Sequence, residues 1–215
     1  MQVISLCSTK GGSSKSTLCT NLTLCAARPL ILDLDSGQVT CEDWWRSRPE
    51  EKEWPQLVSA SATGRQGKVA SFIKAGADVA DFMFIDTPGA VSREVEEAIA
   101  LSDFCLIPCR TSLPDMRAIK STVELVKGRR AAIVLTQAPV GRGSSEAAVV
   151  NEARKALRVY GLSVAPTVIR YRMAYQHAFS SGLTVLEYEP SGAASNEVRA
   201  LFQWVRGELD AAQAA

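Results

Sequence analysis

The chain alternates short apolar runs with longer segments in which apolar positions recur every three or four residues. Runs of about four to six apolar residues bounded by turn signals are typical of strands buried on both faces, and the longer period is typical of amphipathic helices. The runs that predict strands are 2–7, 30–34, 82–85, 104–108, 131–136 and 163–169, with a short one near 56–60. The segments that predict helices are 18–27, 42–46, 70–76, 93–100, 114–126, 144–160 and 196–209.

This order of elements predicts an α/β fold. Strands separated by helices form a doubly wound, mostly parallel sheet with helices on both faces. No internal repeat or long linker divides the sequence, so residues 1–215 are expected to form a single domain. Residues 36–68 are the least regular part, and we expect a mobile surface segment there with a turn over 63–68.

Composition narrows the possible classes of protein. The 215 residues are 47% hydrophobic, which excludes a disordered chain, and six cysteines without a CxxC pair indicate buried reduced thiols. No apolar stretch reaches membrane-span length and no basic leader opens the chain, so a cytoplasmic protein is expected. The net charge of +1 divides into −4 over residues 1–107 and +5 over 108–215, which leaves nucleic-acid binding open.

A glycine-bearing loop over 8–17 joins the first predicted strand to the first predicted helix. Such a loop presents backbone N–H groups and the positive end of a helix dipole to an anion, as in phosphate sites. Lys15 would add a charge for the β and γ oxygens, and the Ser16 hydroxyl would be a ligand for Mg²⁺. The strict GxxxxGK[ST] pattern fails, because Thr9 and Ser14 stand where its glycines would be.

Two aspartates follow predicted strands whose carboxyl ends should meet at the same edge of the sheet. Asp86 is placed to hold a Mg²⁺-bound water, and Asp33 is close enough in the predicted fold to share that work. The predicted magnesium ligands are therefore Ser16, Asp33 and Asp86.

Residues 10–16, KGGSSKS, match KGGxxK[ST], and with this motif the sequence resembles the ParA/MinD family of ATPases, P-loop NTPases with a deviant Walker A motif. Residues 32–38 (LDLDSGQ) resemble the family's DxDPQ motif, and 84–88 (FIDTP) resemble its Walker B motif. The resemblance covers nearly the whole chain. Its short length and Trp44 look most like the small plasmid-partition ATPases of the ParF type.

The resemblance implies an ATPase that binds ATP or ADP with Mg²⁺ and hydrolyses ATP weakly unless a partner stimulates it. Asp35 would orient the attacking water, Lys15 would assist catalysis, and Lys10 would reach across a homodimer to the partner's phosphates. The implied nucleotide-binding residues are Lys10, Gly11, Gly12, Ser13, Ser14, Lys15, Ser16 and Thr17. Ser14 departs from most relatives, which have glycine there, and costs about 1–2 kcal/mol if the position requires a positive φ.

In the function that the resemblance implies, ATP-bound dimers bind non-specific DNA of a bacterial nucleoid. A ParB-like or other small adaptor protein would then trigger hydrolysis and release, segregating plasmid or chromosome DNA. The candidate DNA-contacting residues are Lys127, Arg129, Arg130, Arg154, Lys155, Arg158, Arg170 and Arg172.

Other functions in the same family stay open. The cargo could instead be a carboxysome, a chemosensory cluster or a DNA-transfer complex. A MinD-like membrane-associated regulator is disfavoured, because the terminal helix closes on the acidic 207–210 (GELD), so no membrane partner is expected. An iron–sulfur carrier of the same fold is disfavoured because it would need paired cysteines at a dimer face.

Overall fold

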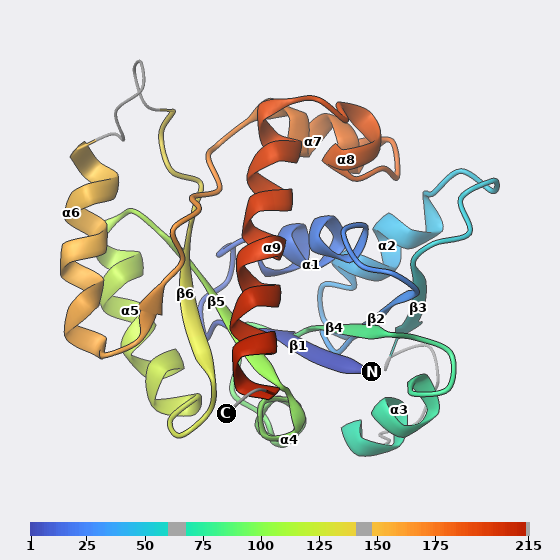
Figure 1. The fold of residues 1–215 in the computed structure, drawn as a ribbon, viewed down its shortest axis with the longest axis horizontal. Helices are drawn as coiled ribbons and strands as arrows, with labels where there is room; N and C mark the ends of the chain where they lie inside the picture. Colours follow the sequence, from blue (N-terminus) through green and yellow to red (C-terminus); the bar gives the residue numbers. More distant parts are fainter. Residues whose placement is uncertain (60–67, 141–147, 214–215) are drawn as a thin grey trace.

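The computed structural model describes residues 1–59, 68–140 and 148–213, and these form a seven-stranded sheet between two layers of helices (Figure 1). The strand order is β3-β2-β4-β1-β5-β6-β7, and all neighbouring strands are parallel. The predicted doubly wound α/β fold is confirmed, since β2 and β3 lie on one side of β1 and β5 to β7 on the other. The strands are β1 (Gln2–Leu6), β2 (Pro29–Asp33), β3 (Gln56–Ser59), β4 (Phe82–Asp86), β5 (Phe104–Arg110), β6 (Ala131–Thr136) and β7 (Ser163–Val164).

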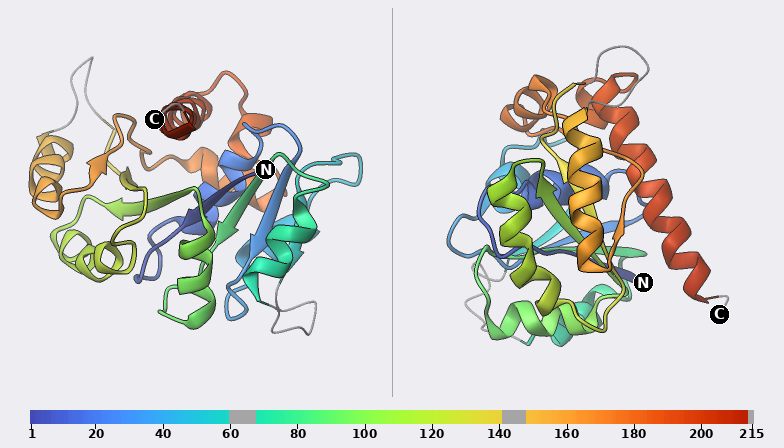
Figure 2. Two further views of the ribbon diagram at one scale, coloured as in Figure 1. Left: turned by 60° about the horizontal axis from the view of Figure 1, so that its bottom comes forward. Right: turned by 90° about the vertical axis from the view of Figure 1, so that its left-hand side faces the viewer.

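Helices cover both faces of the sheet, as Figure 2 shows. Along β1, Ile4 and Leu6 pack in a cluster with residues of α1 and α9, whereas Val3 packs in a cluster on the opposite face with residues of α3 and α4. A further cluster joins β5 and β6 to α4, α5 and α6. The helices are α1 (Lys15–Thr23), α2 (Thr40–Arg46), α3 (Val69–Gly76), α4 (Arg93–Leu101), α5 (Leu113–Leu125), α6 (Ala148–Leu157), α7 (Met173–Ser180), α8 (Val185–Tyr188) and α9 (Ala193–Gln213).

Several predicted boundaries are corrected. The strand predicted over 163–169 ends at Val164, because Pro166 has no N–H to donate to the ladder. The helix predicted over 144–160 is α6 followed by a 3₁₀ turn, Arg158–Tyr160. Residues 144–147 lie outside the described part of the chain, as do residue 60 and most of the predicted turn over 63–68.

The segment after β2 is fastened to the region around α8. Trp44 of α2 is buried, its indole Nε1 donates to the Leu183 carbonyl at 3.1 Å, and the Arg48 guanidinium lies 4.8 Å from the centre of its ring. Arg48 also pairs with Glu187 at 2.9 Å. These contacts fix α2 relative to the helices that follow the last strand.

Candidate active site

The loop between β1 and α1 has the backbone shape of an anion-binding turn. Gly12 has φ of 69°, and Ser14, immediately before Lys15 at the start of α1, has φ of 80°. A β-carbon on Gly89, after β4, would lie 3.3 Å from the Gly11 nitrogen, so glycine lets the two loops approach closely. Ser14 therefore has the positive φ at which a serine, unlike a glycine, is strained.

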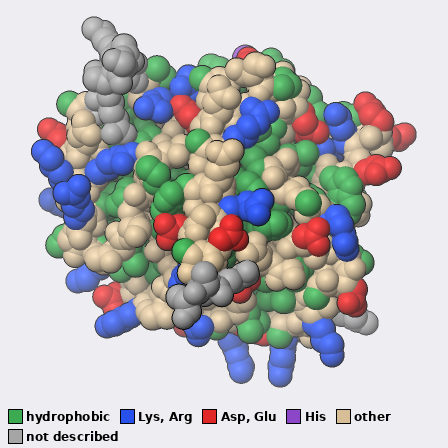
Figure 3. Space-filling view, viewed as in Figure 1, with side chains coloured by type: hydrophobic (Ala, Val, Ile, Leu, Met, Phe, Trp, Pro, Cys, Tyr) green, Lys and Arg blue, Asp and Glu red, His purple; other side chains and the backbone are tan. Residues whose placement is uncertain are grey.

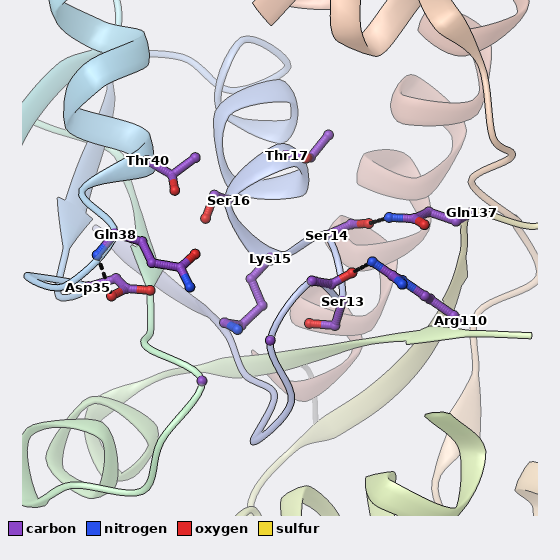
Figure 4. Close-up of a pocket in the computed structure, with 13 residues that line it drawn as sticks. Ser13, Ser14, Lys15, Ser16, Thr17, Asp35, Gln38, Thr40, Arg110 and Gln137 are labelled. Atoms are coloured by element: carbon purple, nitrogen blue, oxygen red, sulfur yellow. Dashed lines mark hydrogen bonds between the residues drawn. The ribbon is translucent and has the colours of Figure 1, made fainter. Parts of the chain in front are cut away.

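A cavity of about 220 Å³ lies against this loop (Figure 4). Figure 4 shows Asp35 and Gln38 on one side of Lys15 and Arg110 and Gln137 on the other. The lining residues are Gly11, Gly12, Ser13, Ser14, Lys15, Ser16, Thr17, Asp35, Gln38, Thr40, Gly89, Arg110 and Gln137. All the predicted nucleotide-binding residues except Lys10 therefore meet at one cavity.

Lys15 is a buried cation in this cavity, 7% exposed. Burial lowers its pKa, while the negative charges of Asp86 and Asp35 oppose that shift. A buried ammonium among carboxylates beside a helix N-terminus is suited to an anionic ligand.

Asp86 is fully buried at the carboxyl end of β4. One carboxylate oxygen, Oδ2, accepts a hydrogen bond from the Cys41 thiol at 3.2 Å, and the Ser16 side chain also hydrogen-bonds to this carboxylate. The other oxygen, Oδ1, is buried without a hydrogen-bond partner among the described residues. Burial raises the pKa of Asp86 to about 6, against the opposing hydrogen bonds from Ser16 and Cys41 and the charge of Lys15.

Asp33 pairs in register with Asp86 across β2 and β4. Its two carboxylate oxygens accept the backbone N–H groups of Asp35 at 2.9 Å and Glu42 at 3.2 Å. Burial, and then the Asp86 charge, raises the pKa of Asp33 to about 7. Asp33 thus shapes the segment that carries Asp35, while its predicted part in holding metal stays a prediction.

This arrangement fits a magnesium ion. The orphaned Oδ1 of Asp86, next to the Ser16 hydroxyl, is a hard oxygen donor with no other partner in the described structure. No cluster of three or more His, Cys, Asp or Glu side chains able to hold a metal occurs within residues 1–59, 68–140 and 148–213. A small set of protein ligands suits Mg²⁺, which keeps several waters and takes its remaining ligands from substrate phosphates.

Lys10 does not line the cavity of its own chain. Its Nζ lies 2.6 Å from Oδ1 of Asp115, in the first turn of α5. Although burial alone would raise the pKa of Asp115, hydrogen bonds from Lys10 and Ser112 lower it. Within one chain, therefore, Lys10 is held by a carboxylate beside the loop.

Arg110 and Gln137 were not predicted from the sequence. Arg110 ends β5 and hydrogen-bonds to the Gly12 carbonyl, while the Gln137 amide donates to the Ser14 hydroxyl at 2.9 Å. A polar residue closing an apolar strand was the available signal, because ligands of open α/β sheets lie beyond the carboxyl ends of strands.

A second cavity of about 180 Å³ adjoins the first and shares Ser14, Thr17 and Gln137 with it. Its remaining wall combines apolar and aromatic groups with hydrogen-bonding side chains. These residues are Leu18, Ile169, Arg170, Tyr171, Arg172, Tyr175 and Gln176. A planar, partly polar group attached to a phosphate chain would fit this pair of cavities.

The predicted DNA-contacting residues fall into three groups. Arg170 and Arg172 pair with Glu197 of α9 at 3.2 and 2.7 Å, so their charges are partly neutralised. The Arg129 and Arg130 side chains donate to the carbonyls of Ala100 and Glu208, and Arg154 donates to the carbonyl of Pro166. Lys127, Lys155 and Arg158 are exposed. Basic side chains gather along the α6 edge and the lower rim of the face in Figure 3.

Comparison with known proteins gives relatives over most of the chain, although no protein-family model matches it. The maintenance of carboxysome distribution protein A of Halothiobacillus neapolitanus is 25% identical over 210 residues, which cover 91% of this chain and 92% of that protein. Protein virC1 of Rhizobium radiobacter is 28% identical over 196 residues, which cover 85% of this chain and 82% of that protein.

Solved structures share the fold. A Cyanothece McdA–ATP complex superposes with a TM-score of 0.75 at 18% identity, covering 98% of this chain and 96% of that one. The cell division ATPase MinD of Pyrococcus furiosus gives 0.71 at 17% identity, covering 96% and 98%. The fold and the loop define the class, a P-loop NTPase with a deviant Walker A motif. Within that class the chain is similar to ParA/MinD-family ATPases, the family that its sequence motifs resemble.

Proposed function

We propose that this protein is an ATP-dependent positioning ATPase that dimerises with ATP, attaches to a cellular matrix and is released when it hydrolyses ATP to ADP and phosphate. The observation that carries the proposal is the cavity that joins the loop to Lys15, beside an Asp86 oxygen that lacks a partner among the described residues. A cavity of this kind is built for a nucleotide phosphate chain with a divalent cation.

The residues around the cavity divide the work. The loop N–H groups and Lys15 would bind phosphate oxygens, and Ser16 and Asp86 would hold Mg²⁺, which supplies charge neutralisation when bound. Asp35, whose Oδ1 accepts the Gln38 N–H at 3.2 Å, lies on the side of Lys15 opposite Arg110 and would orient the attacking water. The second cavity, beside Thr17 and Gln137, would receive the base.

Lys10 would act across the dimer. Its ion pair with Asp115 keeps the ammonium near the loop but outside its own cavity, and that position suits a residue whose target is the partner's phosphate. ATP would then join two chains by offering each Lys10 a stronger anion than Asp115.

The relatives give more information about the cargo than the nucleotide-binding loop does. Two curated relatives are named for carboxysome distribution, which supports positioning of a large protein assembly over plasmid partition specifically. Plasmid or chromosome DNA remains the second candidate. An adaptor protein on the cargo would stimulate hydrolysis.

We propose non-specific DNA as the matrix, bound through exposed charges such as Lys127, Lys155 and Arg158. No helix in the described residues is long and apolar enough to cross a membrane. A MinD-like membrane surface is the alternative matrix, and the acidic close of α9 argues against it.

The test is binding to non-specific DNA with ATP and Mg²⁺, with ADP, and without nucleotide, over a salt series, together with the mass of the protein in each state. We expect DNA binding and a dimer with ATP alone, and an affinity that falls steeply with salt. The variant Lys155→Gln/Arg158→Gln should weaken DNA binding while leaving the ATP-dependent dimer intact. Dimers that ignore DNA would overturn the matrix, and a monomer that binds no nucleotide would overturn the whole proposal.

A further inference from the structure

Arg110 is a cation placed at the nucleotide cavity by the sheet itself. It is the last residue of β5, in which residues 104–109 are buried, and β5 lies directly beside β1. Its side chain therefore emerges where β1 runs into the glycine loop. The Arg110 guanidinium reaches back over the loop, donates to the Gly12 carbonyl and lines the cavity (Figure 4).

The loop leaves space for this guanidinium. A β-carbon on Gly12 would lie 2.7 Å from Nη2 of Arg110, a distance that any larger residue would have to relieve by displacing the arginine. Gly12 also has φ of 69°, which disfavours residues other than glycine. The glycine and the arginine thus fit each other.

The Arg110 guanidinium has N–H donors that no described residue accepts. An arginine has five N–H donors. One group of Arg110 bonds to Gly12, and its Nε is buried without a partner among the described residues. No carboxylate pairs with Arg110 in the described part of the chain, whereas Arg170 and Arg172 both pair with Glu197. Planar guanidinium donors match phosphate oxygens in geometry and charge.

Among the described residues, the cations that line the cavity are Lys15 and Arg110, since Lys10 is held by Asp115. Lys15 and Arg110 lie on different sides of the loop (Figure 4). A phosphate chain lying against the loop would meet positive charge from both sides before a second chain arrives.

We propose that Arg110 is a nucleotide-binding residue of its own chain, which donates to phosphate oxygens in cis. This inference rests on the proposed nucleotide site. Positive charge at the phosphates then comes from the monomer's own residues. Nucleotide binding would therefore occur before dimerisation and would not require the partner's Lys10.

The primary test measures ADP and ATP affinity at a protein concentration where the mass shows a monomer. Arg110→Gln should raise the dissociation constant of ADP by about 10- to 100-fold, the range for losing a hydrogen bond to a charged group. Arg110→Lys keeps the charge without the planar fork and should recover part of the loss. Arg206→Gln on α9, exposed and remote from the cavity, is the matched control and should bind ADP like the parent.

The outcomes separate this inference from the function that underlies it. If the parent protein binds ADP and Arg110→Gln binds it equally well, the role of Arg110 is overturned and the nucleotide site stands. If the parent binds no nucleotide, the site itself fails. The melting temperature of Arg110→Gln is measured without nucleotide, and a value equal to that of the parent shows that the variant is folded. If Arg110→Gln is not folded, the same comparison is made with Arg110→Lys.

Mixing two variants tests whether Arg110 acts in cis. In a dimer of Lys10→Ala with Arg110→Gln, one site contains Arg110 from its own chain and Lys10 from the other. Cis action by Arg110 and trans action by Lys10 predict that mixing the two impaired variants restores ATPase activity at that site. Absence of any recovery, with mixed dimers shown by mass, would contradict the combination of Arg110 in cis and Lys10 in trans.

Discussion

The Nζ of Lys10 lies 2.6 Å from Oδ1 of Asp115, so the family's signature lysine is paired within its own chain. For Lys10 to reach a partner's phosphate, this ion pair must break. The Lys10 side chain is 40% exposed, which makes the pair a modest barrier, on the order of 0.2–1 kcal/mol.

Asp115→Asn should therefore tighten the ATP-dependent dimer, by up to about 30-fold, because two Lys10 side chains, one from each chain, no longer have to leave a carboxylate. The measurement is the dimer dissociation constant with ATP by analytical ultracentrifugation. In a Lys10→Ala background the same substitution should change nothing. A weaker dimer in Asp115→Asn would contradict a restraining role for this pair.

Ser14 has φ of 80°, and the free-energy cost of this backbone strain can be measured. Ser14→Gly should release about 1 kcal/mol of backbone strain, offset in part by losing the 2.9 Å hydrogen bond from Gln137. Ser14→Ala loses the same hydroxyl and keeps the β-carbon, so the two variants should differ by about 1 kcal/mol in unfolding free energy. ATP binding should survive in Ser14→Gly, with ATPase activity equal or higher. Complete loss of binding there would show that the loop is misplaced.

Asp86→Asn should abolish the effect of Mg²⁺ on ATP affinity. The substitution removes the buried negative charge next to Ser16. The fold should tolerate it, because the neutral amide avoids the desolvation cost that raises the pKa of Asp86. We expect parent protein in EDTA to bind ATP like Asp86→Asn, and addition of Mg²⁺ to strengthen binding by the parent alone. Isothermal titration calorimetry with and without Mg²⁺ measures this. A variant that still responds to Mg²⁺ would move the metal away from Asp86.

Glu187 links stability to pH. Hydrogen bonds from Arg48 and Thr184 lower the pKa of Glu187 below its ordinary value of 4.5, against the opposing effect of burial. A lowered pKa means that the ionised form stabilises the fold above pH 4.5, and that this contribution is lost as the pH falls through the folded-state value. The parent should thus lose melting temperature between pH 5 and 3 more steeply than Glu187→Gln.

At neutral pH, Glu187→Gln should cost about 3 kcal/mol, because it leaves Arg48 buried without its carboxylate. Glu189→Gln, on the exposed side of the same turn, is the control and should change the melting temperature little. Parallel pH profiles of the parent and Glu187→Gln would refute the linkage.

Local spacing predicted the parts of the site that lie in one stretch of chain. Lys15 and Ser16 follow from the loop pattern, and Asp86 follows from its place at the end of an apolar strand. Arg110 and Gln137 also follow the apolar part of a strand, but no spacing in the sequence shows that β5 and β6 bring them to the loop, because that approach is tertiary. Lys10 was assigned by resemblance, and its pairing with Asp115 depends on where α5 begins. The early end of β7 could have been predicted from Pro166, since proline has no N–H to donate to a neighbouring strand.

The anchoring of α2 gives the protein an internal optical probe. Trp44 sits in a helix whose first residue, Thr40, lines the nucleotide cavity, and its buried indole is held by Leu183 and Arg48. Movement of α2 when ATP binds would change the polarity around this indole and shift its emission. Stopped-flow tryptophan fluorescence, with Trp44→Phe as the blank, would then time the switch without any attached dye.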